Sequence, residues 1–198
     1  MEYGRALDQI SEIHQHLART EVYRGYRSLP VALSGAVGVI AAALQAPGLA
    51  AADPAGFVLF WTAIAVVAAL VGSSEIAFNY VFREDALGRR RTRLVVGQFA
   101  PSVAAGAIAT AAFVALGAAL VPLLPGLWAL LFGVAVFAAR PYLPRATGLV
   151  ALFYLVAGAW LLWHAAGAPS PWAVGGTFGA GQLAGALVLY WNLERSDG

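Results

Sequence analysis

The sequence predicts an all-α integral membrane protein in which six transmembrane helices form one bundle. Of its 198 residues, 61% are hydrophobic and only 11% are charged, whereas soluble domains average about 45–50% apolar and about 25% charged residues. Intervals without charge recur at the length of one or two membrane spans, and arginines occupy only every second gap between the spans. The length allows one membrane domain and a short soluble segment.

The intervals without charge define the predicted helices, because a helix crosses the hydrocarbon layer of about 30 Å with about 20 apolar residues. They are interrupted only by Glu75 and cover residues 28–52, 54–82, 94–139 and 146–193. The last two are each long enough for two helices, and both contain a segment rich in proline and glycine where the chain can turn, at 121–126 and 167–171. Six helices in three successive hairpins follow.

Proline and serine mark the expected starts of several of these helices. Ser28 precedes Pro30, and we expect Ser28 to be the N-cap of the first helix, with the proline in the first turn. The second helix of each hairpin opens near a proline, at Pro54, Pro125 and Pro171.

The positions of the basic residues predict the orientation in the membrane. All twelve are arginines, and they fall before the first helix, between the second and third, between the fourth and fifth, and after the sixth. Cationic loops are retained in the cytoplasm, so both termini are expected there. The absence of lysine, in a chain rich in alanine and glycine, is typical of a GC-rich bacterial genome. We therefore expect a multi-pass protein of the bacterial inner (plasma) membrane.

The first 27 residues are expected to form a cytoplasmic amphipathic helix followed by an interfacial anchor. Residues 3–20 place Tyr3, Leu7, Ile10, Ile13 and Leu17 on one stripe. The predicted organisation is therefore an N-terminal segment at 1–27, a six-span domain at 28–193 and a cytoplasmic tail at 194–198.

Glu75 is the only acidic residue within a predicted span, and an ionisable side chain there is a candidate functional site. On one hypothesis it binds a proton or cation during transport, with Asn79, Gln98 and Gln182 completing a polar pocket. On the other, Glu75 forms an ion pair with Arg140, or accepts hydrogen bonds from neighbouring polar side chains, and only fixes helix packing. The sequence leaves both open.

An arginine cluster follows the second helix and is a candidate site for anionic lipid headgroups. It consists of Arg89, Arg90, Arg91 and Arg93. Retention of this loop in the cytoplasm explains the cluster equally well. No nucleic-acid partner is expected, because no recognised nucleic-acid-binding motif accompanies the charges.

Glycines in the sixth predicted helix are candidates for close helix packing, within the chain or between two copies. They are Gly175, Gly179, Gly181 and Gly185, of which the last two form a GxxxG pattern around Gln182.

Several chemistries are not expected from this sequence. It has no cysteine, which removes disulfides, thiolate metal ligands and cysteine nucleophiles. His14 and His16 are two residues apart, so on a helix they point in different directions and do not chelate one ion. His164 stands beside tryptophans and has no second membrane histidine to ligate a haem with it. We expect no cofactor, no metal and no catalytic site.

The function expected from these features is that of an accessory, structural or sensory membrane component acting through its cytoplasmic face. Membrane lipids, and a further membrane or cytoplasmic protein, are its expected partners. The alternative is a small-solute or ion transporter built around Glu75.

Overall fold

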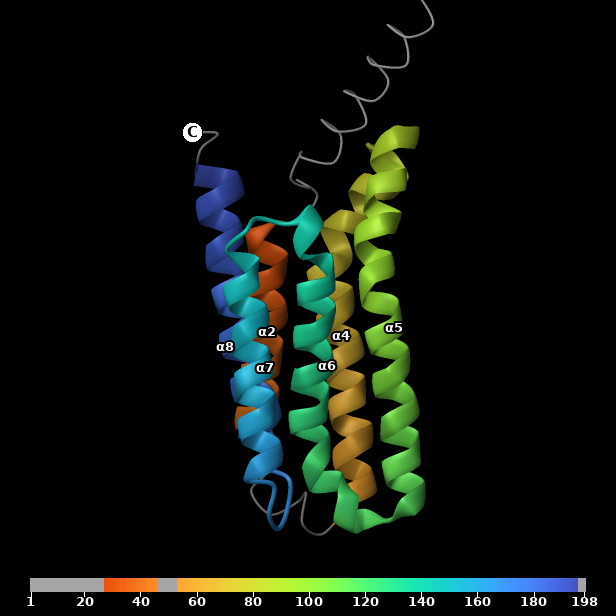
Figure 1. Ribbon diagram of the computed structural model, residues 1–198, viewed down its shortest axis with the longest axis vertical. Helices are drawn as coiled ribbons and strands as arrows, with labels where there is room; N and C mark the ends of the chain where they lie inside the picture. Colours follow the sequence, from red (N-terminus) through yellow and green to blue (C-terminus); the bar gives the residue numbers. More distant parts are fainter. Residues whose placement is uncertain (1–26, 46–52, 196–198) are drawn as a thin grey trace, which may run out of the picture.

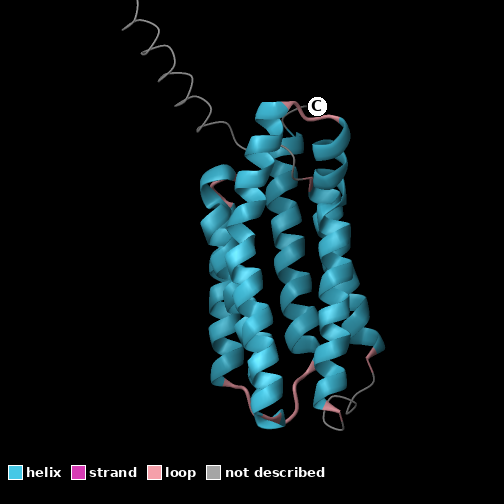
Figure 2. Ribbon diagram, turned by 90° about the vertical axis from the view of Figure 1, so that its right-hand side faces the viewer, coloured by secondary structure: helices cyan, strands magenta, loops and turns pink. Residues whose placement is uncertain are grey.

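The computed structural model describes residues 27–45 and 53–195, which form a single bundle of helices without strands (Figures 1 and 2). The six predicted helices are confirmed within these ranges. Their bounds are Ser28–Leu44 (α2), Pro54–Phe82 (α4), Ala86–Leu116 (α5), Leu124–Ala139 (α6), Thr147–Trp163 (α7) and Pro171–Leu189 (α8). The predicted amphipathic helix at 3–20 and the predicted end of the first span at 46–52 lie outside the described residues.

The expectation that Ser28 is the N-cap of the first helix is wrong. Arg27 precedes α2 in extended geometry and makes no capping bond with its side chain, and Ser28 is the first helical residue. The Ser28 backbone N–H and hydroxyl both donate to the carboxylate of Glu194, at 2.7 Å each. A residue from the other end of the chain therefore caps α2.

The arginine cluster is helical, although the sequence placed it in a loop. Helix α5 begins at Ala86 because the Asp85 carboxylate accepts a hydrogen bond from the Gly88 backbone N–H at 2.8 Å, as an N-cap does. Arginine is also a good helix former. The first two turns of α5 are consequently cationic, and the apolar part starts only after Arg93.

The turn between α5 and α6 comes earlier than predicted. Gly117 ends α5 with a positive φ of 131°, a conformation that favours glycine. A 3₁₀ segment, Ala118–Leu123, then leads into α6. Helices α4, α6 and α8 each carry a proline within their first two positions, as the pattern of Pro54, Pro125 and Pro171 predicts.

The closest helix packing joins α2 to α8, the first and last spans of the bundle. A Cβ atom on Gly175 would overlap the backbone carbonyl of Gly38 and lie 2.5 Å from the Ala42 Cβ. A Cβ atom on Gly35 would lie 2.9 Å from the Gln182 Cβ and 3.2 Å from the Gly179 carbonyl oxygen. Glycines on both helices thus allow their backbones to approach.

A second close crossing joins α6 to α7. Cβ atoms on Gly126 and Gly158 would each lie 2.8 Å from the backbone carbonyl oxygen of the other, and a Cβ on Gly133 would lie 3.1 Å from the Ala151 oxygen. Neither this pair nor α2–α8 is one of the three sequential hairpins. The bundle is therefore held most closely by contacts between hairpins.

Three hydrogen bonds from aromatic side chains join neighbouring helices inside the bundle. The Trp61 indole N–H donates to the buried Gln45 side-chain oxygen at 2.9 Å, and Trp128 donates to the Thr110 hydroxyl at 2.8 Å. Tyr154, whose side chain is fully buried, packs edge-on against Phe132 and donates to the Phe178 carbonyl at 3.3 Å. These bonds cross between helices and fix their relative rotation.

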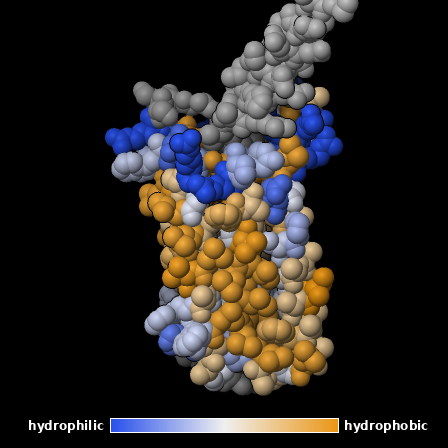
Figure 3. Space-filling model, viewed as in Figure 1, coloured by the Kyte–Doolittle hydropathy of each residue, from blue (hydrophilic) through white to orange (hydrophobic). Residues whose placement is uncertain are grey.

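Large apolar side chains are exposed on all six helices, and the face of the bundle seen in Figure 3 is apolar over most of its height. Four helical segments in the described part of the chain are long and apolar enough to cross a membrane: Pro54–Phe82, Ala86–Leu116, Ala118–Tyr142 and Pro171–Glu194. Helices α2 and α7 are apolar but shorter, with 17 residues each, or about 26 Å at 1.5 Å per residue. The composition and surface are those of a multi-pass membrane protein.

Candidate functional site

Charge gathers at one end of the bundle, the upper end in Figures 1 and 3. We call it the arginine-rich end, because every arginine of the described chain lies at a helix terminus or connection there. These residues are Arg27, Arg83, Arg89, Arg90, Arg91, Arg93, Arg140, Arg145 and Arg195. The charged residue described at the opposite end is Asp53, which caps α4 by accepting from the Gly56 N–H at 3.0 Å.

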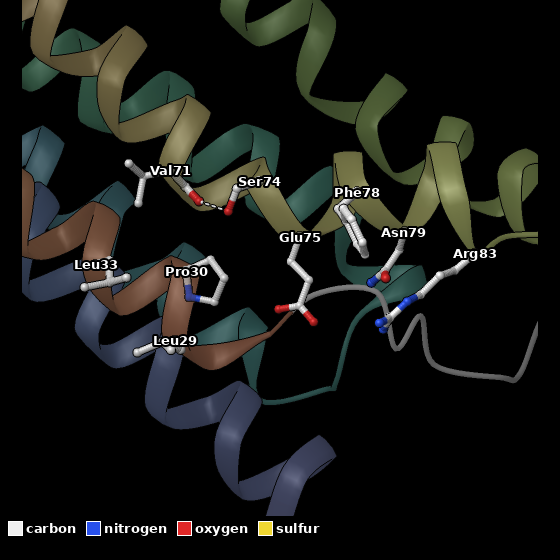
Figure 4. A pocket seen from close by; sticks show the side chains of 9 residues that line it. All are labelled: Leu29, Pro30, Leu33, Val71, Ser74, Glu75, Phe78, Asn79 and Arg83. Carbon is white, nitrogen blue, oxygen red and sulfur yellow. Dashed lines mark hydrogen bonds between the residues drawn. The ribbon is translucent and has the colours of Figure 1, made fainter.

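A groove of about 480 Å³ opens on the side of the bundle between α2 and α4 near the arginine-rich end (Figure 4). Helix α2 contributes its first turns and α4 its last three turns. The lining residues are Leu29, Pro30, Leu33, Val71, Ser74, Glu75, Phe78, Asn79 and Arg83. The groove is lined mainly by apolar side chains, and its polar groups come from α4.

Glu75 lines this groove and forms an ion pair with Arg27, whose Nε lies 3.4 Å from the Glu75 Oε1. The Glu75 side chain is 32% exposed and that of Arg27 is 56% exposed. The pair links the entry of α2 to the last turns of α4. An exposed pair of this kind contributes at most about 1 kcal/mol to stability, so its main consequence is to neutralise the carboxylate within the groove.

Asn79 and Arg83 follow Glu75 at intervals of four residues, which places all three on one face of α4. Figure 4 shows their side chains pointing to the same side of the helix. The Asn79 Oδ1 is buried and accepts no hydrogen bond from any described residue. The Arg83 guanidinium lies 5.2 Å from the centre of the Phe78 ring, a cation–π distance.

A second carboxylate, Glu194, joins the two ends of the described chain. It lies in the short π-helical turn Tyr190–Glu194 that continues α8. Its two oxygens accept the Ser28 N–H and hydroxyl across 166 positions of sequence. A negative charge at a helix N-terminus is favourable, because the first N–H groups of a helix have no partner within it.

The connection between α4 and α5 is ordered by hydrogen bonds from its own side chains. Arg89 donates to the Glu84 carbonyl at 3.2 Å and to the Val81 carbonyl at 3.5 Å, and so covers the C-terminal end of α4. The buried Thr92 hydroxyl donates to the Glu84 carboxylate at 2.8 Å. Arg90 is exposed, and Arg93 bonds back to the Arg89 carbonyl at 3.4 Å. The four arginines predicted as a lipid site thus lie on the first turns of one helix.

The structure brings together only some of the residues proposed for a pocket around Glu75. Glu75 and Asn79 share the groove, whereas Gln98 lies on α5 and Gln182 lies at the α2–α8 crossing, and neither lines it. Arg140 is at the α6–α7 connection, with its guanidinium beside Gly148 and 5.8 Å from the Phe137 ring centre. The cation paired with Glu75 is therefore Arg27, and not Arg140.

The four glycines singled out in the last helix have different surroundings. Added Cβ atoms at Gly175, Gly179 and Gly181 would overlap Gly38, Val39 and the Tyr154 ring respectively. A Cβ atom at Gly185 would lie 3.8 Å from the nearest side chain, an ordinary contact. Of the two glycines in the GxxxG pattern, only Gly181 is therefore tightly packed.

His164 lies at the opposite end of the bundle, where it ends α7. Its Nδ1 is 2.9 Å from the Trp160 carbonyl oxygen, and its ring stacks on Trp160 with centroids 3.8 Å apart. The histidine completes the end of its own helix.

Glu194 and Arg27 are two residues of this region that the sequence alone does not single out. By sequence, Glu194 belongs to the predicted tail and Arg27 to the predicted interfacial anchor. Glu194 directly follows the last apolar span and directly precedes Arg195, so the sequence shows a carboxylate at the end of a helix but not its partner. For Arg27 no signal was available, because its partner depends on which helix lies beside α2.

The sequence matches no protein-family model, no curated protein and no solved structure.

Proposed function

We propose that the chain is a six-span membrane protein of the bacterial inner membrane that works without a catalytic site, as an accessory, structural or sensory component. The observation that carries this proposal is the separation of charge. The arginines lie at one end of the bundle, while the helices between the two ends are apolar and pack closely at glycines. A soluble partner would meet the arginine-rich end, because the connections at the opposite end are short and nearly uncharged.

The orientation proposed here places the arginine-rich end and both termini in the cytoplasm. A cysteine-free chain makes this directly testable by labelling. A cysteine introduced at Ala146, between α6 and α7, should react with a membrane-impermeant maleimide only after the membrane is permeabilised. A cysteine at Ala168, between α7 and α8, should react in intact spheroplasts. The reverse pattern, or labelling of both positions from one side, would contradict six spans with this orientation.

A catalytic role for the serines near Glu75 has little support from geometry. The Ser73 hydroxyl donates to the Ala69 carbonyl at 2.6 Å, and the Ser74 hydroxyl donates to the Val71 carbonyl at 2.7 Å. Each hydroxyl is thus bonded to its own helix and is not directed at a general base. This arrangement favours a non-enzymatic role.

Transport through Glu75 is the second candidate, and one observation favours it. Glu75 shares the groove with Asn79, whose buried oxygen lacks a described partner, and such an acceptor suits a cation. Against this, Glu75 is already paired with Arg27, and Gln98 and Gln182 lie elsewhere.

Flux and copurification in parallel separate the two functions. For an accessory component, proteoliposomes should show no ion or proton flux above that of empty liposomes, and Glu75→Gln should leave this unchanged. A tagged chain should retain a stoichiometric partner, which is lost when Arg89, Arg90 and Arg93 are changed to glutamine. Flux in the wild type that disappears in Glu75→Gln would establish the transporter instead.

A further inference from the structure

The groove between α2 and α4 changes from apolar to cationic along its length. Leu33 and Val71 lie at its deeper end, and Arg83 lies at its outer end, beside the last turn of α4. Twelve residues separate Val71 from Arg83 on α4, or about 18 Å at 1.5 Å per residue. An amphiphile that lies parallel to the helices would match this order, with its apolar chain beside Leu33 and Val71 and its polar head beside Arg83.

The outer end of the groove carries a net positive charge. Arg27 and Glu75 neutralise one another in their ion pair, which leaves the Arg83 guanidinium among the lining residues. The described residues of this end include nine arginines and four carboxylates, which are Glu75, Glu84, Asp85 and Glu194, so the end as a whole is positive. Further arginines follow on the first turns of α5, of which Arg89 and Arg90 are exposed. A ligand with a negative head and without a cation of its own is favoured there.

We propose that this groove binds one acidic phospholipid. Its acyl chain would lie against Leu33, Val71 and Phe78, and its phosphate would accept hydrogen bonds from Arg83. The Asn79 amide, between Glu75 and Arg83, is placed at the level of the glycerol group.

The choice of an acidic lipid over a zwitterionic one follows from the arginines. A choline or ethanolamine cation beyond the phosphate would meet the same end of the bundle, where Arg89 and Arg90 are already exposed. Each arginine near a membrane surface contributes about 1 kcal/mol to binding an anionic lipid. That energy corresponds to about a fivefold preference for each arginine that contacts the headgroup.

This inference rests on the proposed insertion in a membrane, and the test separates the two. Two single-cysteine variants of the full chain carry a fluorophore at comparable distances from the arginine-rich end. Ile40→Cys is exposed on α2, seven residues after Leu33 and so on the same helix face, but it does not line the groove. Val156→Cys is exposed on α7. Both are reconstituted in phosphatidylcholine vesicles that contain a small fraction of either brominated phosphatidylglycerol or brominated phosphatidylcholine.

We expect brominated phosphatidylglycerol to quench the label at Ile40→Cys with about a fivefold preference over brominated phosphatidylcholine, and the two lipids to be about equally effective at Val156→Cys. Arg83→Gln should remove the preference at Ile40→Cys, whereas Arg145→Gln, on the α6–α7 connection, should leave it unchanged. Native mass spectrometry of the unlabelled chain should retain one phosphatidylglycerol, and the Arg83→Gln variant should lose it. Thermal unfolding of both arginine variants shows whether the fold is intact.

Three results would overturn the proposal, and one of them also tests the proposed function. Equal quenching by the two brominated lipids at Ile40→Cys would show that the groove holds bulk lipid only. Equal loss of preference in Arg83→Gln and Arg145→Gln would show attraction to the whole arginine-rich end. Absence of quenching at both labelled positions would show that the bundle is not in the bilayer, and the proposed function would fail with it.

Discussion

Helices α8 and α5 are both apolar and rich in small residues, yet they are packed very differently. Helix α8 has six buried residues among 19, three of which are glycines, whereas α5 has only Thr92 and Val95 buried among 31. Gly175 and Gly179 of α8 lie against Gly38 and Gly35 of α2, where both backbones approach, and Gly181 lies against the Tyr154 ring of α7. On α5, Gly97 has no other group within 4 Å of where its Cβ would be.

The difference shows that small residues alone do not make a close contact between helices, because another helix has to lie against the face that carries them. Alanine and glycine are frequent along α5, but its outer face meets no other helix of the described chain. In a bilayer that face would contact lipid, which is as apolar as the side chains it replaces. How closely two helices pack therefore depends on both of the surfaces that meet. Each prediction below tests one helix surface and what lies against it.

The largest effect is expected at the α2–α8 crossing. Gly175→Ala should destabilise the bundle by about 3 kcal/mol, because the new methyl group would overlap the Gly38 carbonyl on a backbone that cannot easily move. Gly176→Ala is the matched control, since its Cβ would lie 3.7 Å from the nearest atom, on Trp172. Thermal unfolding in detergent compares the two, and equal melting temperatures would contradict the α2–α8 contact.

A slightly smaller loss is expected at one half of the GxxxG pattern. Gly181→Ala would overlap the fully buried Tyr154 ring, which has no room to turn away, and should cost about 2 kcal/mol. Gly185→Ala should be neutral or slightly stabilising, because its methyl group would make ordinary contacts with Val31 and Val150. Unfolding measurements in which both variants lose stability equally would mean that α8 is rotated from the position described.

The cap that closes the α2–α8 pair should contribute less. Glu194→Ala removes two hydrogen bonds to Ser28 and a negative charge from the start of α2, which together cost about 1–2 kcal/mol. Ser28→Ala and the double variant complete a thermodynamic cycle. The two changes should be non-additive, since either one disrupts the same interaction, and additive losses of stability would show that the residues act independently.

The smallest effect, a gain in stability, is expected on α5. Gly97→Ala should raise stability by up to about 1 kcal/mol, because alanine restricts the unfolded chain more than glycine and nothing lies near the new methyl group. The melting temperature in detergent checks this directly. A loss comparable to that of Gly175→Ala would reveal an unrecognised helix against α5, such as a second copy of the chain.

Helix positions were predictable from the sequence wherever single residues mark the ends. Helix α4 spans Pro54–Phe82, as predicted, because Asp53 caps its start and an arginine follows its end. Helix α5 begins about two turns before its predicted apolar span, since charge content alone does not distinguish a cationic helical turn from a loop. The sequence thus located apolar segments well and the polar ends of helices less well.

Which residues meet at the candidate site was less predictable. Glu75 and Asn79 share a face because they are four residues apart on one helix, and helical periodicity predicts this from the sequence. The pairing of Glu75 with Arg27, and of Glu194 with Ser28, depends on the arrangement of helices around the bundle. A set of uniformly apolar helices does not encode that arrangement in its hydrophobic pattern.

The contact between Glu194 and Ser28 has a consequence for how the chain is made. Helix α2 is synthesised first among the described helices, but the residue that caps it and the glycine surface that covers it are synthesised last. Until α8 leaves the ribosome, the glycine face of α2 lacks the helix that covers it in the finished bundle. Assembly of this bundle is therefore complete only when α8 packs against α2. A chain truncated before α8 would leave α2 without its closest partner.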